Sequence, residues 1–258
     1  MNQTQRQMDR PALVRVLAAL ILFGVSFGFV EAAVVVYLRG LYGPIHRRVY
    51  PNAEPGALFP ILLPEDLKAA GPEAEHWLKV ELVREAATMV MLAAVALAGA
   101  RNFRQWLAGF LIAFGVWDIA YYLSLKATLD WPPSLLTPDL LFLLPVPWAG
   151  PVLAPVLVAL TMTATGVIVL RREAAGRPVR PRWGHWLAVL GGGLILVIAF
   201  CWDWHNLMSR QEPGPFNWPL FALGEGLGLA GFLHALWAEG RQALQAPEDR
   251  PASVRTCP

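Results

Sequence analysis

The stretch VLAALILFGVSFGFVEAAVVVYL, residues 16–38, decides the class of fold. Glu31 is the only charged residue in it. A helix needs about 20 predominantly apolar residues to cross a hydrocarbon layer roughly 30 Å thick. This stretch is long for the core of a secretory signal peptide and contains a carboxylate, so it predicts an uncleaved membrane-spanning helix.

Similar stretches recur along the 258 residues of the chain, which is 56% hydrophobic and 16% charged, with a mean hydropathy of +0.45. Soluble domains have about 25% charged residues. We therefore expect an all-α fold, a polytopic membrane helix bundle with about six transmembrane helices. The expected spans are residues 16–38, 80–99, 106–125, 149–170, 184–202 and 218–237. They form a single transmembrane domain, residues 16–238, between an N-terminal segment (1–15) and a tail (239–258) expected to be disordered.

Lysine and arginine are distributed unevenly between the two predicted sides. The segments on the side of the N-terminus hold 13 arginines, whereas the two short loops on the other side hold only Lys126 and Arg210. Cytoplasmic loops of membrane proteins have an excess of these residues. The distribution predicts that both termini are cytoplasmic.

Two outer segments contain their own helix signals. In the outer loop 39–79, a short helix is expected to begin at Pro64 and to end at Gly71, and Pro72 to begin a helix that continues into the second span. The outer segment 126–148 is rich in proline. Thr137, Pro138 and Asp139 resemble the start of a helix, so we expect a short interfacial or re-entrant helix there. The alternative is an apolar loop at the membrane interface.

Carboxylates within the apolar stretches indicate where the protein works. A charge in hydrocarbon costs several kcal/mol, so such residues usually face a protein interior or water. At ~1.5 Å per residue, Glu31 lies ~22 Å and Asp118 ~18 Å above the inner end of their helices. We expect an outward-facing polar cavity among spans one, two, three and six, covered in part by the proline-rich segment. The candidate ligand-binding residues are Glu31, Glu81, Arg84, Glu85, Asp118, Tyr121, Tyr122 and Glu225, and the candidate rim residues are Asp139, Asp203 and His205.

Glycine pairs flank two of these acids. Gly24 and Gly28 precede Glu31, and Gly224 and Gly228 surround Glu225, each pair with the GxxxG spacing that lets helices approach closely. The run of glycines at 191–193 follows no strand, so it predicts close helix packing rather than phosphate binding.

The excess of carboxylates over Arg84 suggests three functions. The leading hypothesis is binding or transport of a small cationic or proton-coupled solute, since protons or a cation would balance the charge. The first alternative is a membrane-embedded enzyme acting on a lipid-linked or outer-leaflet substrate, which predicts a groove reaching lipid. The second is a non-catalytic assembly subunit, in which Arg84 pairs tightly with Glu81 or Glu85 and no cavity remains.

Several other classes of site are absent from the sequence. There is no HExxH zinc motif, no GxSxG nucleophile motif and no Walker loop. A carboxylate-rich site could hold a hard ion such as Mg²⁺, but we assign no metal site and identify no cofactor. His185 and His234 lie near the inner ends of spans five and six, which leaves haem ligation as a minor hypothesis. No run of basic residues indicates nucleic acid.

One part of the chain resembles a known family. The segments FGVWDIAYY (114–122), WPPSLLTPDLLF (131–142) and PVPWAGP (145–151) are similar to a family of uncharacterised bacterial multi-pass membrane proteins. The likeness covers roughly residues 25–155. It implies a location in the bacterial inner (plasma) membrane and no particular reaction.

Overall fold

The computed structural model describes residues 10–54 and 57–245. Six helices in this part of the chain are long and apolar enough to cross a membrane, which confirms the predicted all-α bundle. The helices are α1 (Arg10–Val49), α2 (Pro64–Ala70), α3 (Pro72–Gly99), α4 (Phe103–Leu129), α5 (Leu153–Ala174), α6 (Trp183–Cys201), α7 (Trp204–Met208) and α8 (Trp218–Gln245), and the strands are β1 (Pro138–Phe142) and β2 (Trp148–Pro151).

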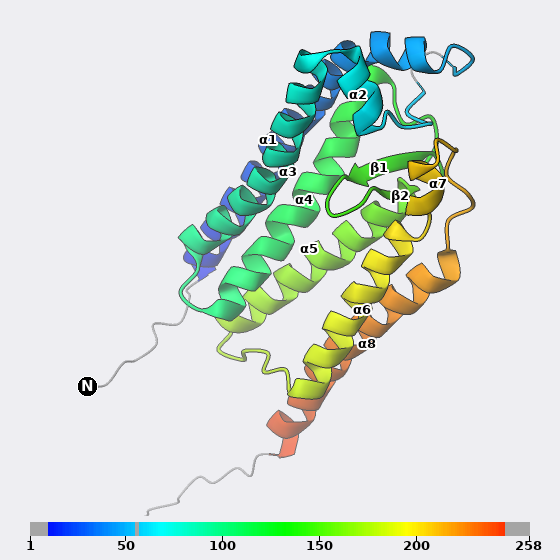
Figure 1. Ribbon diagram of the computed structural model, residues 1–258. Coiled ribbons are helices and arrows are strands. Elements are labelled where there is room, and N and C mark those ends of the chain that lie inside the picture. The colour runs from blue at the N-terminus through cyan, green and yellow to red at the C-terminus, as the bar shows by residue number, and fades with distance from the viewer. Residues whose placement is uncertain (1–9, 55–56, 246–258) are drawn as a thin grey trace, which may run out of the picture.

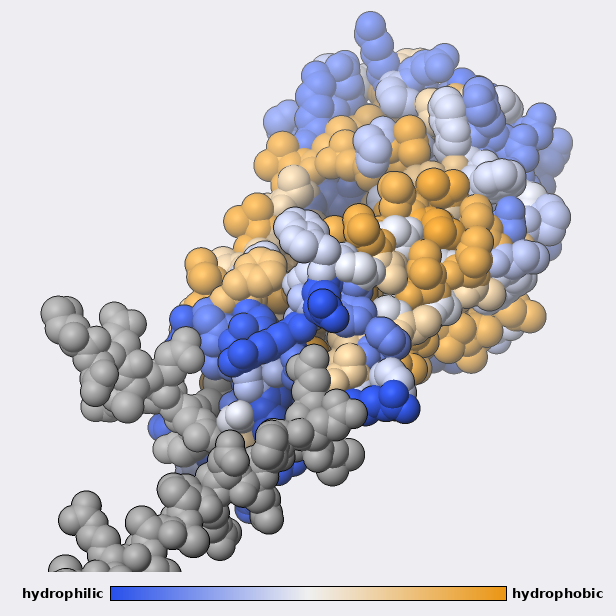
Figure 2. Space-filling view, turned by 90° about the horizontal axis from the view of Figure 1, so that it is seen from below, coloured by the Kyte–Doolittle hydropathy of each residue, from blue (hydrophilic) through white to orange (hydrophobic). Residues whose placement is uncertain are grey.

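The long helices run side by side, with α2, α7 and the two strands gathered at one end of the bundle (Figure 1). Helix α4 packs against α1, α3 and α5, while α6 pairs with α8. The start of α1 and the end of α8 both lie at the opposite end (Figure 1). Figure 2 shows that end, with hydrophilic residues gathered on it and hydrophobic residues along the flanks. This distribution is the one expected of helices whose flanks contact lipid.

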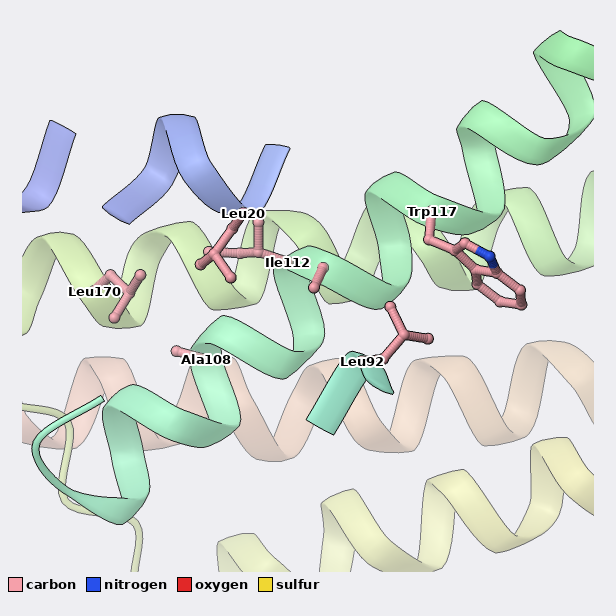
Figure 3. Close-up of a cluster of buried hydrophobic side chains, with 7 residues drawn as sticks. Leu20, Leu92, Ala108, Ile112, Trp117 and Leu170 are labelled. Carbon is pink, nitrogen blue, oxygen red and sulfur yellow. The ribbon is translucent and has the colours of Figure 1, made fainter. Parts of the chain in front are cut away.

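The core is built around α4. Half of its apolar window is buried, against 17–28% for the other spans. Leu20 of α1, Leu92 of α3 and Leu170 of α5 surround Ala108 and Ile112 of α4 (Figure 3). Since the other helices expose many apolar side chains, their outer faces suit lipid contact.

Glycine permits the closest helix approaches. A Cβ on Gly28 would lie 2.6 Å from the carbonyl oxygen of Trp117, and one on Gly192 would lie 2.5 Å from that of Gly224. Real Cβ atoms do not come this close to backbone oxygens. The predicted close packing is therefore confirmed at the GxxxG pairs and, within the glycine run, at Gly192, whereas a Cβ on Gly193 would meet nothing within 4 Å.

The proline-rich segment is a β-hairpin, so the short helix expected there is wrong. Strands β1 and β2 are antiparallel, with Leu140 opposite Ala149. Thr137 does not cap a helix, because its hydroxyl accepts from the Ser134 N–H instead. Proline lacks the N–H that a helix interior requires. Span four begins at Leu153 rather than at residue 149, because Trp148–Pro151 form β2 and pair with β1.

Helix α1 is longer than its predicted span. It continues past residue 38, through Pro44, to Val49. Hydropathy marks the part of a helix that lies in lipid, not the point where its hydrogen bonding ends. The basic residues in its last turn stabilise this end, because positive charge interacts favourably with the negative end of the helix dipole. The short helix from Pro64 and the long helix from Pro72 are present as predicted.

A cap, made of residues 57–70, the β-hairpin and α7, closes this end of the bundle. Its apolar cluster joins Phe59, Ile61 and Leu63 to Leu207 of α7. An ion pair of 2.7 Å between Arg210 and Asp66 links the same two segments at the surface. The cap forms the roof of the cavity described next.

Candidate functional site

A cavity of about 540 Å³ lies beneath the cap, and we call it the chamber. Side chains of α1, α3, α4, α5, α6, the cap and its hairpin line it. It brings together seven of the eight candidate ligand-binding residues and one of the three rim residues. These are Glu31, Glu81, Arg84, Glu85, Asp118, Tyr121, Tyr122 and Asp139.

Arg84 connects α3 to α1. Its Nη1 lies 2.6 Å from Glu31 Oε1 and its Nη2 lies 2.5 Å from Glu81 Oε1. Nε donates a further hydrogen bond of 2.9 Å to Glu81, and Nη1 donates one of 3.3 Å to the Thr88 hydroxyl. Thus two carboxylates hold this guanidinium in place, and its charge is already balanced.

Glu85 connects α3 to the hairpin. Both oxygens of its carboxyl group accept from the backbone N–H of Leu143, at 3.0 and 3.2 Å. Leu143 directly follows β1, where the chain turns toward β2. One side chain of a spanning helix therefore anchors the turn of the hairpin over the chamber.

Asp118 and Asp139 are the most enclosed acids of the chamber. The Tyr122 hydroxyl donates a hydrogen bond of 2.9 Å to Asp139 Oδ2. Burial raises the pKa of Asp139 to about 6, against the lowering effect of the Tyr122 hydrogen bond and of the Arg39 charge. Asp118 is only 9% exposed, and its Oδ2 has no hydrogen-bond partner among the described residues. A buried acceptor of this kind is costly unless something else satisfies it.

Carboxyl groups outnumber cations in the chamber. Arg84 is the only arginine of the chamber in an ion pair within the described residues, and the Arg39 guanidinium lies over the ring of Trp131, 4.8 Å from its centre. Three buried acids of the chamber form no ion pair in the described part of the chain: Glu85, Asp118 and Asp139. Positive charge or protons from elsewhere would compensate them.

Three candidate residues lie outside the chamber. Glu225 belongs to α8, where it hydrogen-bonds Thr161 of α5. Asp203 accepts from Asn206 and from the Gly214 N–H, each at 2.5 Å, and so orders the segment after α6. The ring of His205 packs on Trp204, with centroids 4.0 Å apart. The rise per residue predicts the depth of a side chain but not the direction in which its helix faces.

Several chamber residues come from the part of α1 beyond its predicted end. Arg39, Tyr42 and His46 line the chamber together with Glu31 and Val35 of the predicted span. Their spacing of three or four residues is that of one helix face. This periodicity, continued past residue 38, would have identified them from the sequence.

The two histidines at the opposite end contact each other. His185 Nε2 lies 2.9 Å from His234 Nδ1, too close to hold a haem iron between the rings. No group of three or more His, Cys, Asp or Glu side chains within residues 10–54 and 57–245 is placed to hold a metal ion.

Comparison with protein-family models, curated proteins and solved structures found no match to the chain. The resemblance to a bacterial membrane family therefore stays a prediction.

Proposed function

We propose that the protein binds a small cationic or proton-exchanging solute in the chamber. The observation that carries this proposal is the set of three buried acids, Glu85, Asp118 and Asp139, that line a 540 Å³ cavity without an ion pair in the described structure. A cation would supply the missing charge, and proton uptake would remove the need for it. Both outcomes follow from the same carboxyl groups.

Each surrounding residue has a role in this proposal. Asp118 has a free oxygen and contacts the cation directly. Tyr122 fixes the orientation of Asp139 through its hydrogen bond. Glu85 holds the hairpin as a cover over the chamber. Arg84, whose charge Glu31 and Glu81 balance, keeps α1 and α3 together rather than binding the solute.

The proposed setting is a bacterial inner membrane, with the cap on the outer side and both termini in the cytoplasm. Support comes from the excess of arginine at the end opposite the cap. The start of α1 and the end of α8 also lie at that end (Figure 1). The solute would then enter from outside the cell.

The chamber argues against the assembly-subunit hypothesis, which expects Arg84 to be paired and no cavity to remain. Arg84 is paired, yet a cavity of about 540 Å³ lies beside it. Transport and catalysis both begin with binding, so a binding experiment tests the step that they share.

The experiment compares wild-type protein with Asp118→Asn and Asp130→Asn in lipid nanodiscs. Asp130 ends α4, is exposed, and has a left-handed backbone that asparagine tolerates, so it is a matched control. Thermal unfolding is followed in choline, triethylammonium or guanidinium chloride, against sodium chloride at equal ionic strength. A cation at 100 times its Kd should stabilise by about 2.7 kcal/mol, which is about 5–11 °C for a chain of this size.

We expect this increase for the wild type and for Asp130→Asn, and its loss in Asp118→Asn. An equal increase in all three proteins would show that the cations act elsewhere. No increase with any of the three cations would contradict the proposal.

A further inference from the structure

We infer that the chamber takes an amphipathic cation, with a positively charged head group and a hydrocarbon chain. The positive charge of the head group follows from the proposed function, on which this inference rests, and the hydrocarbon chain is the new element. The chamber continues from the carboxyl groups to a wholly apolar part, which we call the apolar arm. Its side chains are Phe114 of α4, Val158 and Met162 of α5, and Leu196 and Val197 of α6.

The arm is open because of how the helices pack. Helix α6 packs closely on α8 and β2 but not on α5. The arm occupies space lined by both α5 and α6. Each of its five side chains is only half-buried, so part of its surface is left uncovered.

The chemistry of the arm excludes a bare cation as its occupant. None of the five side chains has a polar group that could bind a charge or hold a water by several hydrogen bonds. Water in an apolar space lacks the two to four partners that it needs. A hydrocarbon chain covers this surface favourably, at about 0.8 kcal/mol for each methylene buried.

The two ends of the chamber therefore select for different chemistry. Asp118 supplies a buried oxygen without a partner in the described structure, and Asp139 lies beside it in the same cavity. Phe114, one helical turn before Asp118, already belongs to the arm. A ligand that satisfies both ends has its charge next to the start of its chain, as in a long-chain amine or an alkyltrimethylammonium ion.

The depth of the arm suits such a ligand. Phe114 lies ~17 Å along α4 from its first residue, which is near the middle of the span. A chain in the arm would lie at the depth of lipid hydrocarbon, and its head group would lie nearer the cap. The volume of about 540 Å³ is in the range of about 300–1,000 Å³ for ligand pockets.

The test uses tetramethylammonium and butyl-, hexyl- and octyltrimethylammonium bromide, with octyl sulfate as the anionic counterpart. Affinities are measured from thermal shifts in nanodiscs, for the wild type and for Val197→Trp, which fills the arm. Ile198→Trp is the matched control, because its side chain is the next one along α6, is exposed and does not line the chamber. Met162→Phe blocks the arm from α5 in case the change in α6 disturbs folding. Ratios between proteins at one chain length cancel partition of the probe into lipid.

We expect the ratio of wild-type to Val197→Trp affinity to be near one for tetramethylammonium. It should rise by up to about four-fold for each methylene that enters the arm. Ile198→Trp should follow the wild type, and Met162→Phe should follow Val197→Trp. Octyl sulfate should not compete with octyltrimethylammonium for the wild-type protein.

Two results would overturn the inference and leave the proposed function standing. The first is a ratio that does not change with chain length while tetramethylammonium still binds in a manner that depends on Asp118. The second is equal competition by octyl sulfate with the same dependence on Asp118. If no cation of any length binds through Asp118, both the inference and the proposed function are wrong.

Discussion

Replacing Gly28 by alanine should loosen the contact on which the chamber depends. The new Cβ would lie 2.6 Å from the Trp117 carbonyl oxygen and 2.8 Å from the Tyr121 nitrogen. An ordinary contact is 3.4 Å or more, so α1 and α4 must separate by about 0.8 Å. Overpacking of this kind costs about 1–3 kcal/mol. For a chain of this size the melting temperature should fall by about 2–12 °C.

The same displacement should weaken the site. Gly28 lies one turn before Glu31 on α1, and its contact on α4 spans Asp118, which lies between Trp117 and Tyr121. Gly28→Ala therefore moves one chamber acid relative to the other. Choline-dependent stabilisation should fall together with the melting temperature, both measured by thermal unfolding in nanodiscs.

Gly40→Ala is the matched control on the same helix. A Cβ at Gly40 meets nothing within 4 Å. There, alanine should stabilise the helix by about 0.5–1 kcal/mol, because glycine loses more backbone entropy on folding. If Gly28→Ala were as stable as Gly40→Ala, the close approach of α1 to α4 would be wrong.

Three further results are expected. Arg84→Gln leaves its carboxylate partners without a cation, which costs about 3–5 kcal/mol when a buried pair is broken; adding Glu31→Gln should recover part of this loss in a double-mutant cycle, whereas strict additivity would contradict the pairing. Since burial raises the pKa of Asp139 to about 6, above its usual 3.8, the folded protein retains a proton that the unfolded chain releases. Its contribution to the free energy of unfolding is full below pH 3.8 and is lost as the pH rises through 6, on the order of 3 kcal/mol. In Asp139→Asn the melting temperature should depend less on pH across this range, and an unchanged dependence would exclude the effect. Glu85→Ala removes the acceptor of the Leu143 N–H, so hydrogen exchange at this amide should accelerate, and unchanged protection would show that other contacts hold the hairpin.

The sequence predicts the fold well because bilayer thickness constrains it. Each spanning helix needs its own apolar stretch, and such stretches are visible without any knowledge of contacts. The β-hairpin is different, since its strands depend on pairing between Leu140 and Ala149 and on the acceptor that Glu85 offers to Leu143. The contact between Glu85 and Leu143 is distant in sequence, and local signals at Thr137 and Pro138 suggest a helix instead.

The site is predictable in depth but not in direction. Glu31 and Asp118 share a depth, and the structure brings both to the chamber. Glu225 has a comparable depth, but α8 pairs with α6, and its side chain lies beside Thr161. The packing of α8 decides this: Gly224 marks a face of α8 that packs closely, but the sequence does not say that the partner is α6. The face of α1 that continues to His46 is the opposite case, because helical periodicity past residue 38 predicts which of its side chains line the chamber.

Within the chamber, some acids hold the helices and the hairpin in place, whereas another acid is available to a ligand. Glu31 and Glu81 are satisfied by Arg84, so their charges are used to hold α1 against α3. Glu85 accepts from the Leu143 N–H, a bond that needs no cation. Among the described acids that line the chamber, Asp118 is the one with a buried oxygen that has no partner, and so it gains most from a bound charge. A cation that binds there would compensate the charge of Asp118 without breaking any contact that holds the bundle together.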